Sequence, residues 1–197
     1  MADVYAARDR RDDRLVAVKF VKPRRFKRRR HRQRLAVEIH ALGSVTHPNV
    51  VQLLDVGMDG ELPFLVMELV PGLSLGEWVR DHGPLAPRQA LRLLRGVGLG
   101  LETMHRVDVL HRDVKPGNVL LEIADGKPVN AKLSDLGLAK LSTMHGPTQE
   151  GALMGSPTYM APEQVAGEPA DQRSDVYGWA MTLFLAVTGR RAFEGSR

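Results

Sequence analysis

One short run constrains this chain more than any other, because positions 111–118 read His-Arg-Asp-Val-Lys-Pro-Gly-Asn. The run holds an acid at Asp113, a cation at Lys115 and an amide at Asn118. Phosphoryl transfer from ATP uses such a set: the acid accepts a proton from the attacking hydroxyl, the cation reaches a phosphate and the amide holds a metal ion. A polar turn facing water is the structural alternative. It is disfavoured because a match at every one of these ordered positions is rare by chance.

Further short motifs stand in order around this run. Upstream, residues 16–19 (Val-Ala-Val-Lys) predict a strand that ends in Lys19, and Glu38 follows on a helical pattern. Downstream, residues 134–137 read Ser-Asp-Leu-Gly, and residues 155–163 read Gly-Ser-Pro-Thr-Tyr-Met-Ala-Pro-Glu.

In this order the motifs resemble the eukaryotic-type protein kinase family, with its strand lysine, helix-C glutamate, HRD catalytic loop, DFG motif (here DLG) and APE motif. The Lys-Pro-Gly-Asn end of the loop and the Gly-Ser-Pro-x-Tyr segment are similar to the Ser/Thr branch of the family, in its bacterial form. The resemblance runs from Asp3 to about Phe193 and covers nearly the whole chain.

The composition is compatible with such a fold. A length of 197 residues allows one good core or two small lobes, and 43% hydrophobic with 26% charged residues is ordinary for a globular protein. The absence of cysteine excludes disulfides and thiolate metal sites. The sequence contains neither a membrane-length apolar run nor a signal peptide. We therefore expect a cytoplasmic chain, or the cytosolic part of a longer membrane-anchored protein.

The net charge of +5 is concentrated in residues 22–34, which hold nine Lys or Arg and no acid. Such a run could bind nucleic acid or an acidic partner. A solvated face at the start of helix C is favoured, because one basic run is weak evidence for nucleic acid. A third interpretation follows from the resemblance, since this edge of many kinases meets the phosphorylated activation loop. We expect no nucleic-acid partner.

The resemblance implies an α+β, bilobal kinase fold. Residues 1–70 would form a small antiparallel N-lobe with helix C, and residues 71–197 a mainly helical C-lobe. The patterns predict strands at 4–7, 15–20, 50–56 and 64–70, helix C at about 27–43, helices at 75–82, 87–106 and 175–188, and a hairpin at 119–133. Gly96, Gly98 and Gly100 have the wrong spacing for a phosphate loop, and we expect them to let their helix pack closely.

The resemblance also gives the motif residues roles in catalysis. Asp113 would orient and deprotonate the substrate hydroxyl, and Lys115 would neutralise charge on the transferred phosphoryl group. Lys19 would pair with Glu38 and the ATP phosphates, and the Ser156 hydroxyl would lie near the catalytic loop. The expected catalytic residues are therefore Asp113, Lys115, Lys19, Glu38 and Ser156, and the expected Mg²⁺ ligands are Asn118 and Asp135.

The adenine site is likewise implied by resemblance. Met67 matches the gatekeeper, and the backbone of Glu68 and Val70 would meet the adenine edge. The ring would lie between three apolar side chains, those of Val4, Ala17 and Leu120, whose alternative role is plain core packing.

Regulation by phosphorylation is a further implication, because Arg112 precedes the catalytic acid and an arginine there requires an anion. Thr148 is the first candidate site and Thr143 the second. The expected partners are protein substrates with Ser or Thr, together with a second copy of the chain for trans-phosphorylation.

The chain departs from the family's pattern at both ends. Ala2 stands where the third glycine of the Gly-rich loop is usual, so we expect weaker ATP positioning. The family's helices after the one containing Asp175 are missing, so Glu163 would lack its arginine partner and apolar surface would be exposed. Asp108 replaces a glycine at a position that requires positive φ, which Asp tolerates.

Two other functions compete with an active Ser/Thr kinase. One is a catalytically weak or inactive kinase-fold binding module, damaged by the missing ends rather than by substitutions. The other is a small-molecule phosphotransferase. The latter is disfavoured because the APE segment and Ser156 would form a docking ledge for a peptide.

Overall fold

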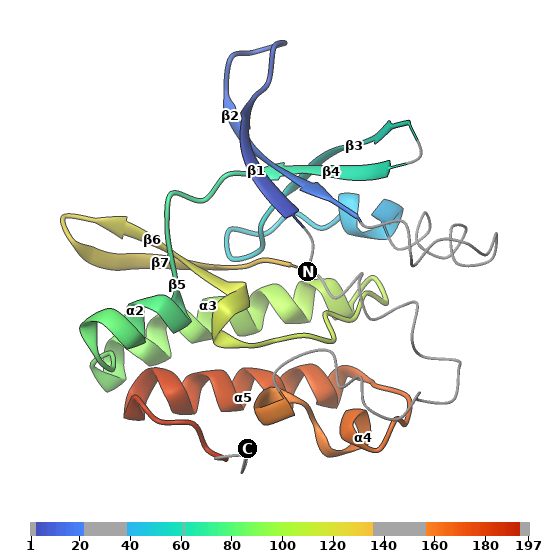
Figure 1. The fold of residues 1–197 in the computed structure, drawn as a ribbon. Coiled ribbons are helices and arrows are strands. Elements are labelled where there is room, and N and C mark those ends of the chain that lie inside the picture. The colour runs from blue at the N-terminus through green and yellow to red at the C-terminus, as the bar shows by residue number, and fades with distance from the viewer. Residues whose placement is uncertain (1–2, 22–38, 61, 136–156, 194–197) are drawn as a thin grey trace.

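The computed structural model describes residues 3–21, 39–60, 62–135 and 157–193, and most of the predicted helix C lies outside this part. The described chain has an antiparallel sheet, a smaller sheet beside it and a helical half (Figure 1). This arrangement confirms the α+β class. No helix in the described ranges combines the length and apolar character needed to span a bilayer.

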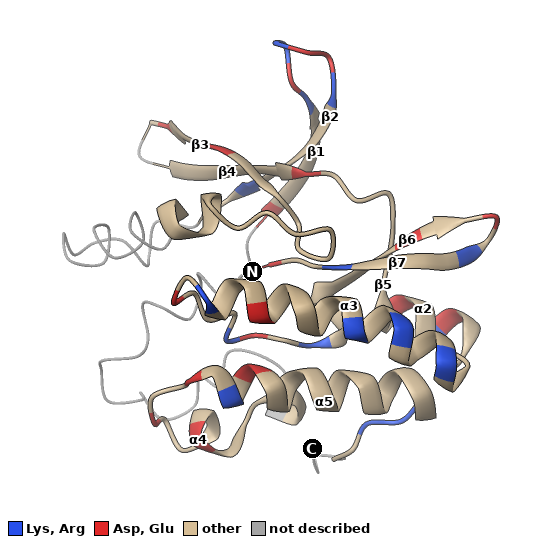
Figure 2. Ribbon diagram, turned by 180° about the vertical axis from the view of Figure 1, so that it is seen from behind, with Lys and Arg blue, Asp and Glu red and all other residues tan. Residues whose placement is uncertain are grey.

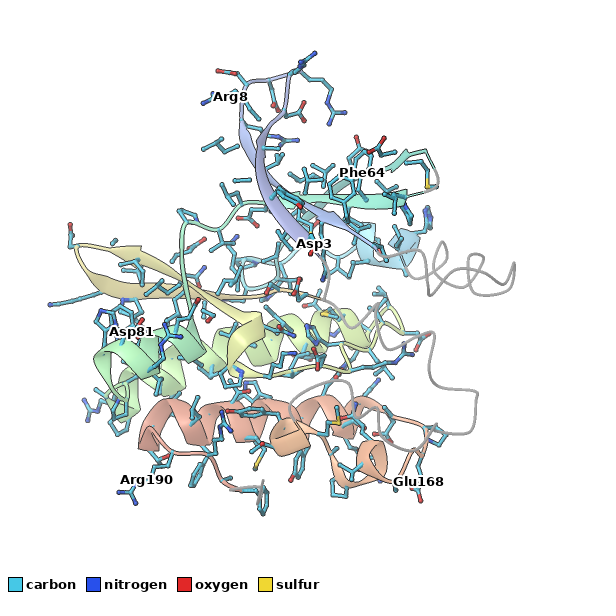
Figure 3. The ribbon with its side chains drawn as sticks, in the orientation of Figure 1. Asp3, Arg8, Phe64, Asp81, Glu168 and Arg190 are labelled. Carbon is cyan, nitrogen blue, oxygen red and sulfur yellow. The ribbon has the colours of Figure 1, made fainter. Side chains whose placement is uncertain are left out.

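The first sheet is formed, within the described residues, by β1 (Asp3–Arg8), β2 (Leu15–Phe20), β3 (Leu53–Asp59) and β4 (Leu62–Glu68) in the order β1-β2-β4-β3. All neighbours pair antiparallel. β1 runs from Asp3, at its end nearer the helical half, to Arg8 at the far turn (Figure 3). Charged residues of both signs lie along this turn (Figure 2), where Arg11 pairs with Asp9 and with Asp55 of β3.

The predicted strands at 50–56 and 64–70 were misplaced by a few residues. Residues 50 and 51 pair with the second sheet instead: Val50 forms a parallel bridge with Leu133, and the Val51 amide donates to the Leu133 carbonyl at 2.9 Å. The apolar run is thus divided between two sheets, which periodicity alone does not reveal. β4 ends at Glu68, so Val70 lies beyond the strand, directly before a proline.

The second sheet is formed, in the described part, by β5 (Gly72–Ser74), β6 (Val119–Ala124) and β7 (Lys127–Leu133), in that order. The β6–β7 hairpin has the predicted bounds. Asp125 and Gly126 both have positive φ, 50° and 69°, as expected for an Asp-Gly hairpin turn. Asp108 also has the expected positive φ, 57°.

The helical half contains α2 (Leu75–His82), α3 (Pro87–His105), α4 (Pro162–Val165) and α5 (Gln172–Thr188), with short 3₁₀ turns η2 (Pro116–Asn118) and η3 (Pro157–Tyr159). Ser74 and Glu77 form a capping box at the start of α2. Helix α5 begins three residues before the predicted Asp175, because Asp171 caps it by accepting from the Arg173 amide at 2.7 Å.

Helix α3 is the centre of the core. Leu94, Val97 and Met104 of α3 are fully buried, and the helix packs between β7 and α5. A Cβ at Gly96 would lie 2.6 Å from the Asn49 side chain, and one at Gly100 would lie 2.8 Å from Val50. The prediction of close packing is confirmed for these two glycines, whereas a Cβ at Gly98 would lie at an ordinary contact distance of 3.5 Å from Trp179.

Helix α5 exposes two large apolar side chains. Val176 is 55% exposed and Phe184 43%. The Glu163 carboxylate, which was expected to lack its arginine partner, accepts a hydrogen bond from the Ser174 hydroxyl.

Candidate active site

The catalytic loop brings its three predicted polar residues together. Lys115 Nζ lies 2.7 Å from Asp113 Oδ2. Asn118 Nδ2 donates to the Asp113 carbonyl at 2.8 Å and to Asp113 Oδ2 at 3.1 Å. The η2 turn makes this possible, because the Asn118 amide donates back to the Lys115 carbonyl at 2.9 Å. An acid, a cation and an amide therefore converge within one turn of chain.

Asp175, at the start of α5, holds this loop from behind. Its Oδ1 accepts from the Arg112 amide at 2.6 Å, and its Oδ2 accepts from the His111 amide at 2.9 Å. His105 Nε2 lies 2.8 Å from the same Oδ2. The Asp175 side chain is only 1% exposed. Buried carboxylates require such partners, so the anchor and the loop depend on each other.

His111 connects the loop to the residue before Asp135. Complete burial lowers the pKa of His111, although the nearby Asp175 carboxylate opposes the shift. The ring is then neutral at pH 7. Its Nε2 lies 2.8 Å from the Ser134 carbonyl and Nδ1 lies 3.3 Å from the Asp113 amide. These partners assign the proton to Nε2, since a carbonyl needs a donor and an amide needs an acceptor.

Lys19 of β2 and Asp135, which lies two residues after β7, form an ion pair. Lys19 Nζ lies 2.7 Å from Asp135 Oδ1, with side chains 13% and 43% exposed. Asp135 has a φ of 56°. The preceding Ser134 is fixed to the loop, because its amide and hydroxyl both donate to the Asn118 carbonyl, at 2.8 and 3.1 Å. Asn118 and Asp135 are thereby held close to each other.

The predicted adenine residues of the first sheet share one face. Val4 lies opposite Lys19, and Ala17 lies opposite Met67, in antiparallel register. Directly opposed residues in such a pair project to the same side, as do residues two apart. Leu120 comes from β6 of the second sheet, opposite Lys132.

Sequence reasoning missed an ion pair between β4 and the β6–β7 hairpin. Lys132 Nζ lies 2.5 Å from Glu68 Oε1 and 3.7 Å from Glu122 Oε1. Glu68 was predicted to act through its backbone, yet its side chain ties the end of β4 to the β6–β7 hairpin. The available signal was a lysine between Ala131 and Leu133, both buried.

The oxygen donors present fit a magnesium ion that is completed by other ligands. Asp135 and Asn118 offer carboxylate and amide oxygens, which Mg²⁺ prefers. Among the described residues, no group of three or more His, Cys, Asp or Glu is placed to hold a metal ion. Phosphate and water oxygens would therefore supply most of the coordination.

Four predicted site residues fall outside the described ranges, namely Glu38, Thr143, Thr148 and Ser156. The Lys19–Glu38 pair and both phosphorylation sites therefore remain predictions. Arg112 is described: its backbone lies in the left-handed region, with a φ of 64°, and its carbonyl accepts from Gln164 Nε2 at 3.0 Å.

Comparison with known proteins gives consistent matches. The family model described as "Protein kinase domain" matches residues 1–197. The chain is 38% identical over 192 residues to serine/threonine-protein kinase PknL of Mycobacterium tuberculosis. The match covers 98% of this chain and 47% of that protein. It is 33% identical over 195 residues to serine/threonine-protein kinase PrkC of Bacillus subtilis, covering 99% and 30%.

Among solved structures, Rad53 1–466 in complex with AMP-PNP matches with a TM-score of 0.79 and 28% identity, covering all of this chain and 47% of that one. The chain thus spans less than half the length of each of these proteins.

Proposed function

The chain belongs to the protein kinase family, with serine/threonine kinases as its relatives, and on this premise we propose that it transfers the γ-phosphoryl group of ATP to Ser and Thr hydroxyls of protein substrates. The convergence of Asp113, Lys115 and Asn118, backed by the buried Asp175, is the observation that carries this proposal. The similar Rad53 structure is a complex with the ATP analogue AMP-PNP, which supports ATP as the donor.

The proposed reaction begins at Asp113. Its carboxylate orients the substrate hydroxyl and takes its proton as the new oxygen–phosphorus bond forms. The bond between the γ-phosphorus and the bridging β–γ oxygen breaks, and ADP leaves with that oxygen. Lys115, which lies 2.7 Å from Asp113, turns toward the transferred group and offsets its charge.

Nucleotide binding requires Lys19 to leave Asp135. The lysine would then reach the phosphates, and the Asp135 carboxylate and the Asn118 amide oxygen would be the residues that hold Mg²⁺. Bound Mg²⁺ supplies positive charge that offsets the phosphates. The adenine ring would lie on the face with Val4, Ala17 and Met67, above Leu120, with its edge toward the backbone of Glu68 and Val70.

We further propose that residues 1–70 and 71–197 act as two lobes with the nucleotide between them. Self-phosphorylation at Thr148, or second at Thr143, would give Arg112 an anionic partner, as the resemblance implies. A binding module with weak or no activity is the second candidate. It is favoured by the Lys19–Asp135 pair, which occupies both groups that a nucleotide needs.

The test is intact-mass detection of phosphate added by the chain to itself in the presence of Mg²⁺ and ATP. We expect the wild type to gain phosphate and the Asp113→Asn variant to gain none. Asp125→Asn, at the β6–β7 turn, is the matched control and should behave as the wild type. The binding module would be favoured by a folded wild type that binds ATP, gains no phosphate and transfers none to a Ser/Thr peptide.

A further inference from the structure

The side chain of Gln164 makes two hydrogen bonds that join α4 to the catalytic loop. Its Oε1 accepts from the Ala161 amide at 3.1 Å, which caps the start of its own helix. Its Nε2 donates to the Arg112 carbonyl at 3.0 Å, across 52 residues of sequence. One amide group therefore contacts both the helix end and the residue directly before Asp113.

The carbonyl that Gln164 contacts belongs to a constrained piece of backbone. Arg112 has a φ of 64°, in the left-handed region that residues other than glycine rarely adopt. Such conformations persist where surrounding contacts enforce them. Here Asp175 accepts from the Arg112 amide at 2.6 Å on one side, and Gln164 donates to its carbonyl on the other.

The same contact fixes the orientation of Asp113. The Arg112 carbonyl and the Asp113 amide are parts of one planar peptide unit. Gln164 holds the carbonyl end of this plane, and His111 Nδ1 lies 3.3 Å from the amide end. Rotation about the Cα–C bond of Arg112 would swing this plane, displace the Cα of Asp113 and change where its carboxylate lies. Asp175 does not contact this plane at its carbonyl end, so it does not replace Gln164.

The chemistry at position 164 requires a glutamine. The Ala161 amide needs an acceptor and the Arg112 carbonyl needs a donor, and the side-chain amide offers both. Glutamate lacks the donor, lysine lacks the acceptor and asparagine is one methylene shorter. The two functions can also be separated, because glutamate keeps the acceptor that caps α4 while losing the donor to Arg112.

We propose that Gln164 is a positioning residue for phosphoryl transfer, acting on Asp113 through the Arg112 carbonyl. The inference rests on the proposed kinase function. It makes the position of α4, which follows the segment 136–156, a determinant of where the catalytic acid lies.

The test compares Gln164→Glu with Gln89→Glu in the 197-residue chain. Gln89 is a matched control because its Nε2 also donates to a backbone carbonyl, that of Pro128 at 3.2 Å, away from the loop. We expect Gln164→Glu to lower kcat about 10- to 100-fold, since small misplacement of a catalytic group has effects of this size. Its KM for ATP and its melting temperature should stay near the wild-type values. Gln89→Glu should change none of these quantities.

A second measurement does not depend on activity. Hydrogen exchange of the amides at 111–113 should accelerate in Gln164→Glu and not in Gln89→Glu, because the peptide plane loses its carbonyl partner. An unchanged kcat in an active Gln164→Glu variant would overturn the inference, and so would unchanged exchange at 111–113. If the wild type transfers no phosphate, the proposed function fails on its own, and the exchange data still decide whether Gln164 holds the loop.

Discussion

The two sides of the candidate site are built differently. On the catalytic-loop side, Asp175 is 1% exposed and accepts hydrogen bonds from backbone amides of the loop. On the nucleotide side, Lys19 and Asp135 meet through a side-chain ion pair, with Asp135 43% exposed. In the first contact, the Asp175 carboxylate is buried, so water cannot readily replace the backbone amides as its partners. The second joins long or exposed side chains that can exchange partners.

This difference matches the tasks proposed for the two sides. The acid that receives the proton must stay within a few tenths of an ångström of its place, and buried backbone anchors provide that rigidity. In the proposed reaction, the lysine and the aspartate must release each other to bind phosphate and metal. A partly exposed ion pair contributes little to stability and opens readily. We therefore expect loss of the Asp175 anchor mainly to lower stability, and loss of the Lys19–Asp135 pair mainly to lower activity.

Asp175→Ala should have the largest effect on stability. It leaves the amides of the buried His111 and the partly buried Arg112 without their acceptor, and we expect a loss of about 3–5 kcal/mol in the free energy of unfolding. Denaturant titration measures this loss. Asp171→Ala, which removes only the cap of the same helix, is the control, with an expected loss of about 1 kcal/mol. Equal losses for both variants would contradict the anchoring role of Asp175.

Lys19→Met should have the opposite profile. We expect the rate of phosphoryl transfer to fall about 100- to 1000-fold, because one charge partner of the phosphates is lost. The free energy of unfolding should change by less than about 1 kcal/mol. Kinetic assay and denaturant titration on one preparation give both values. Lys127→Met, at the exposed start of β7, should leave both unchanged. A large loss of stability in Lys19→Met would show that the pair with Asp135 is a structural anchor.

Lys132→Met tests the ion pair that joins the β6–β7 hairpin to the end of β4. The Lys132 side chain is 12% exposed and its ammonium contacts Glu68 and Glu122, so its removal leaves two carboxylates without this cation. We expect a loss of about 1–2 kcal/mol in the free energy of unfolding. A double-mutant cycle with Glu68→Gln should give a coupling of about 1 kcal/mol. Arg80→Met removes an exposed ion pair with Asp81 and should have no measurable effect. An absence of coupling would mean that Lys132 does not tie β4 to the hairpin.

Local features of the site could be predicted from sequence, and contacts between distant segments could not. Asp113, Lys115 and Asn118 lie within one turn of chain, so their spacing alone indicates convergence. The start of α2 at Leu75 was equally local, because the capping pair Ser74 and Glu77 stands in the sequence. Pairing of sheets is different: the apolar run at 50–56 gave no sign that its first residues join β7.

The missed contacts have large sequence separations. Gln164 reaches Arg112 across 52 residues, and Lys132 reaches Glu68 across 64. The sequence around a single glutamine or lysine does not identify the distant residue that it contacts, because the contact forms only after both elements have packed. The roles of Glu38, Ser156, Thr143 and Thr148 stay predictions, since these residues lie outside the described ranges.

The smallest expected effect is a dependence of the free energy of unfolding on pH, to which His111 of the catalytic loop contributes. Burial lowers the pKa of His111 below its usual 6.5, and burial also lowers that of His47. The unfolded chain therefore binds protons near pH 6.5 that the folded chain excludes, so the free energy of unfolding should be constant above this pH and fall below it. Each such proton contributes a slope of at most about 1.4 kcal/mol per pH unit. Denaturant titrations between about pH 5.5 and 8 measure the slope, and His111→Asn should reduce it. A free energy of unfolding that instead rises as the pH falls would mean that the attraction of Asp175 for a charged ring outweighs burial, and the loop side would then share the electrostatic character of the Lys19–Asp135 pair.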